Sequence, residues 1–149
     1  DAAFEFLMSA EGWKSNEKHD SGCKTIFGIS ERWYPVAYQL TAAKSYEDGL
    51  AYVRTYFYYP EFWVKSHCDA LTWALNIAVF DTAVNMGHSS AQRILSETET
   101  VEQYLQRRKD AYNSIIRRNP IQEKFRNGWH NRLTHLIEFI HQKNKEWEG

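Results

Sequence analysis

The stretch ALTWALNIAVFDTAVNMG, residues 70–87, decides the fold. Its apolar side chains fall on all sides of a helical wheel, and a helix without a polar face is a buried one. We expect this helix to cover residues 67–86, with Gly87 well placed to end it. Its most apolar part is too short to span a bilayer and is followed by Asp81. The sequence therefore predicts a mainly-α domain built around a buried central helix, without a membrane span.

Helical patterns also occur over residues 2–11, 46–58, 89–96, 101–118 and 121–145. Ser45 is expected to cap the second of these helices, because acidic residues follow it in the first turn. Residues 13–30 have no periodicity and contain Gly22 and Gly28, so they predict a loop or a short hairpin. No repeat or linker interrupts the pattern, and we expect one domain over residues 1–149.

The composition excludes several classes of protein. With 149 residues and 43% apolar side chains, the chain is long enough and apolar enough to build one core. The net charge of −1 provides no broad basic surface, so nucleic acid is not expected as a partner. Two arginine pairs are expected on solvated helix faces rather than on a phosphate-binding track. These pairs are Arg107–Arg108 and Arg117–Arg118.

Metal and cofactor binding are not expected from the sequence. The six His residues form no pair four residues apart with a third ligand, and His130 and His135 are five apart, facing different ways. No glycine loop that could cradle phosphate occurs. Cys23 and Cys68 permit one disulfide, but their spacing does not show whether they lie close in space. The first residues show no secretory signal.

Two carboxyl groups near the start of the chain, Glu11 and Asp20, stand in contrasting settings. A carboxylic acid donates a proton at neutral pH only where an apolar setting disfavours its charged form. Met8 and Trp13 flank Glu11 at the end of an apolar helix, whereas Asp20 lies in a polar loop where it stays ionised. Such a pair is what hydrolysis of a glycosidic bond requires. On these residues alone, a solvated helix end and a turn-forming aspartate are the commoner explanation.

Three blocks of sequence carry a more specific pattern. The first is EGW, residues 11–13, followed by DSGCKTIFGIS, residues 20–30. The second is FDTAVNMG, residues 80–87, and the third is FRNGWHNR, residues 125–132. In this order they resemble glycoside hydrolase family 108, which comprises bacterial and phage N-acetylmuramidases with a lysozyme-like helical fold and a C-terminal peptidoglycan-binding region.

The resemblance implies a catalytic part over residues 1–96 and a helical, peptidoglycan-binding-like part over residues 97–149 packed onto it. It identifies Glu11 as the general acid and Asp20 as the group that stabilises positive charge on the sugar ring or acts as base. Thr25 could hold the attacking water through its hydroxyl. The implied activity is that of a lysozyme or endolysin, which cleaves the β-1,4 bond between N-acetylmuramic acid and N-acetylglucosamine in peptidoglycan.

The side chains expected to contact the glycan are Trp13, Ser30, Tyr56 and Asn85. Asp81 lies four residues before Asn85 and shares its helix face. We expect Asp81 to hold the loop 13–30 by hydrogen bonds rather than to bind sugar, because a buried acid needs partners.

Peptidoglycan strands are the expected partner. We expect the protein to be a monomer and to act on the cell wall, in the periplasm or outside the cell. A lytic transglycosylase or a chitinase-like enzyme on the same fold stays open. Trp13, Lys14 and Cys23 depart from the family pattern, which bears on substrate preference more than on the fold. A non-catalytic module that binds the wall or has a structural role also stays open. Asp20 discriminates between hydrolase and transglycosylase, since a transglycosylase can manage with one acidic residue.

Overall fold

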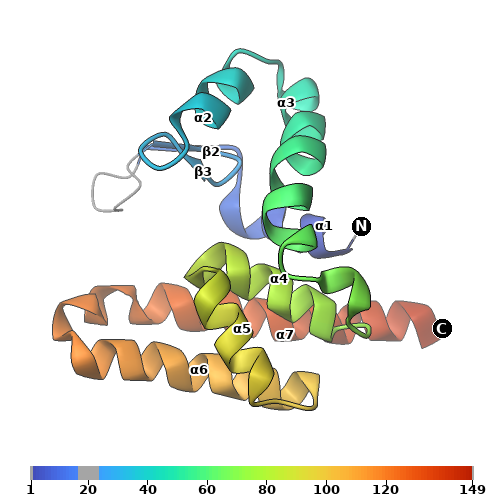
Figure 1. The fold of residues 1–149 in the computed structure, drawn as a ribbon, viewed down its shortest axis with the longest axis vertical. Helices are drawn as coiled ribbons and strands as arrows, with labels where there is room; N and C mark the ends of the chain where they lie inside the picture. The colour runs from blue at the N-terminus through green and yellow to red at the C-terminus, as the bar shows by residue number, and fades with distance from the viewer. Residues whose placement is uncertain (1, 17–23, 149) are drawn as a thin grey trace. The chain divides into compact units, whose positions relative to one another are not determined.

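The structure is a computed structural model that describes residues 2–16 and 24–148 (Figure 1). The backbone divides into two compact units, Asp1–Lys65 and Ser66–Gly149. Most of the described residues are helical, which confirms the mainly-α fold class. No helix among them is long and apolar enough to cross a membrane. The division into parts at 1–96 and 97–149 stays a prediction.

The first unit combines helices with a small antiparallel sheet in the order β1-β2-β3. Its elements are α1 (Ala2–Glu11), β1 (Lys14–Asn16), β2 (Lys24–Ile26), β3 (Ile29–Ser30), α2 (Pro35–Ala42), α3 (Tyr46–Val53) and a π-helix (Arg54–Val64). The short hairpin expected within residues 13–30 is therefore confirmed. In register, Thr25 pairs with Ser15 on β1 and with Ser30 on β3.

Capping and proline set the helix boundaries of this unit. Ser45 Oγ accepts a hydrogen bond from the Asp48 N–H at 3.2 Å, so the expected cap is confirmed. The expected helix over residues 46–58 is wrong beyond Val53, where wider π-turns begin. Pro60 lies inside this segment and has no N–H to donate, so regular α-helical bonding cannot run through it.

The second unit is helical throughout its regular elements. These are a 3₁₀ turn (Cys68–Ala70), α4 (Leu75–Met86), α5 (His88–Ser96), α6 (Val101–Arg118), a second 3₁₀ segment (Pro120–Phe125) and α7 (Arg126–Glu148). Within this unit α6 and α7 lie side by side, and α4 and α5 pack against α6 (Figure 1). The expected helix over residues 101–118 matches α6, whereas the expected last helix begins as a 3₁₀ segment and becomes α-helical only at Arg126.

The stretch that decides the fold is buried as expected, but its helix is shorter. Residues 77–83 of α4 are almost fully buried. The helix begins at Leu75 rather than at residue 67, because His67 and Ala74 adopt φ of 56° and 72°, which interrupt right-handed helix. Cys68 is a buried free thiol in the preceding turn, and burial raises its pKa to about 12. Its possible disulfide partner, Cys23, lies outside the described residues.

A buried ion cluster joins three helices of the second unit. Asp81 on α4 is 1% exposed, and its carboxylate lies 2.8 Å from Arg108 Nη1 on α6 and 2.8 Å from Arg132 Nη2 on α7. Burial raises the pKa of Asp81, but the two guanidinium groups outweigh burial and hold it below its usual value. Asp81 therefore has the structural role that we expected. Its partners among the described residues are the two arginines, whereas we expected it to hold the loop 13–30. The expectation that Arg108 is solvated is wrong: it is 0% exposed, because the buried carboxylate needs a charged partner.

Candidate active site

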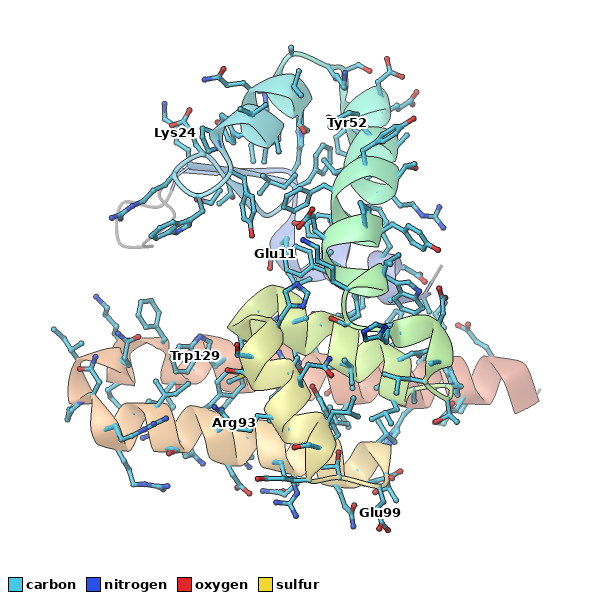
Figure 2. The ribbon with its side chains drawn as sticks, viewed as in Figure 1. Glu11, Lys24, Tyr52, Arg93, Glu99 and Trp129 are labelled. Carbon is cyan, nitrogen blue, oxygen red and sulfur yellow. The ribbon has the colours of Figure 1, made fainter. Side chains whose placement is uncertain are left out.

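Glu11 is the last residue of α1 and is half-buried (Figure 2). Gly12 follows with φ of 70°, a left-handed conformation that glycine adopts without steric cost. The Gly12 N–H donates to the Met8 carbonyl at 3.0 Å and closes the last turn of α1. The chain then turns directly into β1. The candidate acid therefore lies at a sharp junction between helix and sheet, where its backbone position is fixed on both sides.

The turn between β2 and β3 lies against the side chain of Glu11. Phe27 and Gly28 both have positive φ, 49° and 81°, as the central residues of a type I′ hairpin require. A Cβ placed on Gly28 would lie 2.9 Å from Glu11 Cγ and 2.7 Å from Tyr58 Oη. Only glycine therefore permits the backbone to approach the acid and Tyr58 so closely.

Tyr58, a buried residue of the π-helix, holds this turn in place. Its hydroxyl donates to the Phe27 carbonyl at 2.6 Å. The Phe27 N–H in turn donates to the Trp13 carbonyl at 2.5 Å, beyond the end of α1. Glu11 is thus positioned by the helix that carries it, by the hairpin turn and by a tyrosine from a distant part of the chain. No signal in the sequence indicates this role of Tyr58, because the residue lies 31 positions from the carbonyl that it contacts.

Two of the expected glycan contacts have exposed aromatic rings in this unit. Trp13 is 43% exposed and packs edge-on against Tyr46, with ring centroids 5.1 Å apart. Tyr56 is 69% exposed and lies near Tyr52, with centroids 5.3 Å apart. Both rings therefore have faces that a sugar could contact.

The other expected residues of the first unit lie on the sheet. Thr25 on β2 and Ser30 on β3 are directly opposite each other, so their side chains share a face. Ser30 is 9% exposed, and its Oγ accepts from the Trp33 N–H at 3.3 Å. Thr25 is half-buried. Asp20, the expected second carboxylate, lies outside the described residues.

Asn85 belongs to the second unit, near the end of α4. The orientation of its amide follows from the number of protons on the Tyr112 hydroxyl. Tyr112 Oη accepts from Arg108 Nε at 3.0 Å and from Arg108 Nη2 at 2.9 Å. A phenol hydroxyl has two lone pairs and one proton, so the proton goes to its third neighbour, Asn85 Oδ1. This arrangement leaves both Nδ2 protons of Asn85 for other partners. The ring of Trp129 stacks on Tyr112 at 5.0 Å and braces it.

Within residues 2–16 and 24–148, no three His, Cys, Asp or Glu side chains gather as metal ligands. The described part of the site offers the Glu11 carboxyl group, which lies against the Gly28 backbone, and the Tyr58 hydroxyl beside that turn.

A comparison with protein families matches the model described as Glycosyl hydrolase 108 over residues 4–87. This segment contains Glu11, the Phe27–Gly28 turn, Tyr58 and Asn85. Neither the curated proteins nor the solved structures give a significant match to the chain. Because the family match covers more than half of the 149 residues, the chain belongs to glycosyl hydrolase family 108 and is a glycoside hydrolase.

Proposed function

We propose that the protein is an N-acetylmuramidase, which cleaves the β-1,4 bond between N-acetylmuramic acid and N-acetylglucosamine in peptidoglycan. The observation that carries the proposal is the position of Glu11, a carboxyl group held at the end of α1 by the glycine turn and next to Tyr58. Precise positioning is what a proton donor needs, because proton transfer requires hydrogen-bond contact with the leaving oxygen. Membership of a glycoside hydrolase family supports the same role.

In the proposed reaction Glu11 protonates the glycosidic oxygen as the bond to the anomeric carbon breaks. Asp20 stabilises the positive charge that develops on the sugar ring or activates water on the opposite face. Thr25 holds that water through its hydroxyl. The water adds to the anomeric carbon and gives a proton to the carboxylate of Asp20 or of Glu11, so the products are two chains with one new reducing end and the enzyme keeps its proton count. No cofactor takes part in this scheme.

The remaining candidate residues bind glycan in this proposal. The exposed rings of Trp13 and Tyr56 stack on pyranose rings, whose C–H faces suit aromatic surfaces. Asn85 donates from Nδ2 to a sugar hydroxyl or acetamido oxygen, and Ser30 contributes a hydroxyl near Thr25. The enzyme acts on the cell wall as a monomer.

The test is release of reducing ends from purified peptidoglycan by the wild type and by Glu11→Gln. Glutamine keeps the size of the side chain and removes the donatable proton, so we expect activity to fall by roughly 100-fold or more. Glu47→Gln, the same substitution at an exposed site in the first turn of α3, is the matched control and keeps wild-type activity. Equal activity in both variants would remove Glu11 from the mechanism.

Mass spectrometry of the fragments separates the proposal from its closest alternative. A hydrolase gives reducing N-acetylmuramic acid, whereas a lytic transglycosylase gives its anhydro form, and a chitinase-like enzyme releases ends from chitin instead. Asp20→Ala inactivates a hydrolase that uses two carboxylates and leaves a transglycosylase largely active. Binding to purified sacculi without any release of ends would show a wall-binding module instead.

A further inference from the structure

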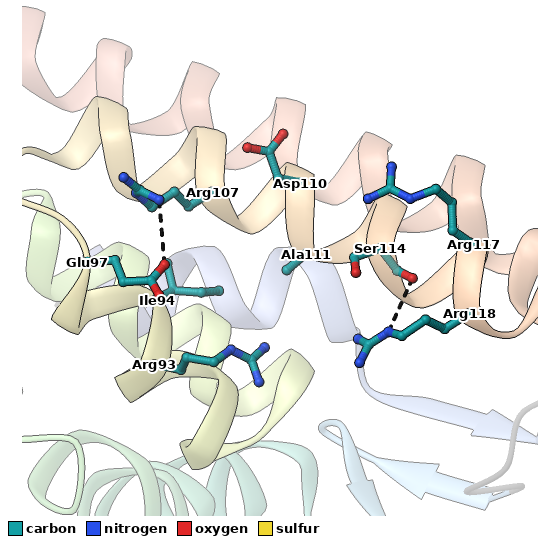
Figure 3. Close-up of a pocket in the computed structure, with 9 residues that line it drawn as sticks. All are labelled: Arg93, Ile94, Glu97, Arg107, Asp110, Ala111, Ser114, Arg117 and Arg118. Atoms are coloured by element: carbon teal, nitrogen blue, oxygen red, sulfur yellow. Dashed lines mark hydrogen bonds and ion pairs between the residues drawn. The ribbon is translucent and has the colours of Figure 1, made fainter.

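A groove of about 500 Å³ lies between α5 and α6 of the second unit (Figure 3). Its lining residues are Arg93, Ile94, Glu97, Arg107, Asp110, Ala111, Ser114, Arg117 and Arg118. The sequence alone favoured a solvated face for the arginines of α6. The structure agrees that three of them are exposed but gathers them, with Arg93 of α5, around one hollow.

The groove carries a local excess of positive charge. Four arginines face two carboxylates, Glu97 and Asp110, whereas the whole chain has a net charge of −1. Only one weak pair forms across the groove, from Arg107 Nη1 to Glu97 Oε2 at 3.5 Å. Among the described residues, Arg93 and Arg117 have no ion-pair partner. An excess of like charges in one groove favours an anionic ligand.

The shape of the groove suits a chain rather than a single ion. Arg107 and Arg118 are eleven residues apart on α6, so about 16 Å of helix separates them. Ala111 and Ser114 lie between them, and these small side chains leave the groove open. Arg93 extends from α5 toward Arg118 of α6, so guanidinium groups converge on the groove from both walls (Figure 3).

We propose that this groove binds a linear phosphate-bearing polymer of the sugar-phosphate or polyol-phosphate class. A tetrahedral phosphate presents oxygens in several directions and can accept from guanidinium groups on two helices at once, as Arg93 and Arg118 are placed to donate. A planar carboxylate is satisfied by a single guanidinium fork and makes no use of the second wall. Ser114 lies between the arginines and provides a further hydroxyl donor.

Nucleic acid is the other common phosphate polymer, and the lining argues against it. Proteins that bind single strands stack bases on aromatic side chains, and the groove lining contains no aromatic residue. The groove is therefore suited to a backbone of phosphates without bases. The proposal goes beyond glycan hydrolysis and does not depend on Glu11, so its success or failure is independent of the proposed function.

The test is titration calorimetry of the full chain with lipid-free poly(glycerol phosphate), at low and at physiological salt. The variant Arg93→Gln/Arg118→Gln removes one guanidinium from each wall. We expect it to weaken binding by roughly tenfold and to reduce the salt dependence, since each exposed charge contact contributes a modest free energy. Lys44→Gln/Lys145→Gln makes the same change in net charge at exposed sites outside the groove and keeps wild-type affinity.

A second variant, Arg93→Lys/Arg118→Lys, keeps the charge and removes the planar fork, and we expect an affinity between those of the wild type and the glutamine variant. Melting curves confirm that all variants are folded. No binding by the wild type, or equal weakening in the glutamine and control variants, would overturn the proposal. Tighter binding of oligothymidine or of polyglutamate than of the phosphate polymer would overturn the assignment of the ligand. Glu11→Gln leaves the affinity unchanged.

Discussion

Replacing Asp81 by asparagine removes one charge from the centre of the second unit and leaves the shape of the side chain nearly unchanged. In the wild type, one carboxylate pairs with both Arg108 and Arg132 at 2.8 Å each, and Arg108 is entirely buried. After the change, Arg108 keeps its hydrogen bonds to Thr82 at 3.2 Å and to Tyr112 but loses its only counter-charge among the described residues. The cost is therefore that of a buried charge left unpaired.

Breaking a buried ion pair by removing one partner costs about 3–5 kcal/mol. We expect Asp81→Asn to lower the free energy of unfolding by about that amount at neutral pH, a large part of the typical total of about 5–15 kcal/mol. The folded pKa of Asp81 lies below its unfolded value. The ionised carboxylate therefore stabilises the fold fully at pH values above its unfolded pKa of about 4, and this contribution is lost progressively as pH falls from there through the lower folded pKa. The difference between wild type and variant should shrink in acid accordingly.

Urea unfolding, followed by circular dichroism at neutral and acidic pH, measures this effect. Asp110→Asn is the matched control, because Asp110 is exposed on α6 and its only described hydrogen bond is with Gln106 at 3.1 Å. The control should change stability by less than about 0.5 kcal/mol. If Asp81→Asn lost less than about 1 kcal/mol with an unchanged denaturant slope, the ion cluster would not be what holds α4 to its neighbouring helices.

Three further results are expected. Gly28→Ala should cost about 1–3 kcal/mol of stability and most of the hydrolytic activity, because the new Cβ is strained and meets Glu11, the proposed acid. Gly12→Ala, where the Cβ meets nothing within 4 Å, should show the strain alone in melting curves. Tyr112→Phe should lower stability in urea by about 1–3 kcal/mol, because two N–H groups of Arg108 lose their acceptor; an unchanged midpoint would contradict this. The Cys68 thiol, whose pKa is raised to about 12, should resist iodoacetamide in the folded chain and react after unfolding. Peptide mapping would show this, and rapid labelling of the native protein would contradict the burial of the thiol.

The sequence predicted the parts of this fold that depend on local signals. The Ser45 cap and the amphipathic pattern of α6 fixed their helices, because side-chain capping and a one-sided apolar stripe are properties of neighbouring residues. The local pattern predicted the wrong start for α4. Residues 67–74 continue the apolar pattern of the helix, but the backbone leaves the right-handed helical conformation at His67 and Ala74. Apolar composition indicates that a segment is buried, but it does not show whether the buried segment is a helix or a turn.

Long-range contacts account for what was missed at the candidate site. Glu11 and Gly28 are recognisable from their motif, but the hydrogen bond from Tyr58 to the Phe27 carbonyl joins positions 31 residues apart. No periodicity or spacing relates such residues. Arg108 was misplaced for the same reason, since its counter-charge is on another helix.

The ion cluster also limits how this enzyme can be divided for engineering. The family match ends at residue 87, and both arginines that neutralise Asp81 lie beyond it. A chimera built from the matched segment alone would contain Asp81 without Arg108 and Arg132, and α4 would lose the helices that bury it. A recombination junction placed after Met86 would put Asp81 on one parental segment and its two arginine partners on the other. Exchange of segments between related glycoside hydrolases should therefore carry the chain through α7, so that Asp81, Arg108 and Arg132 are inherited together.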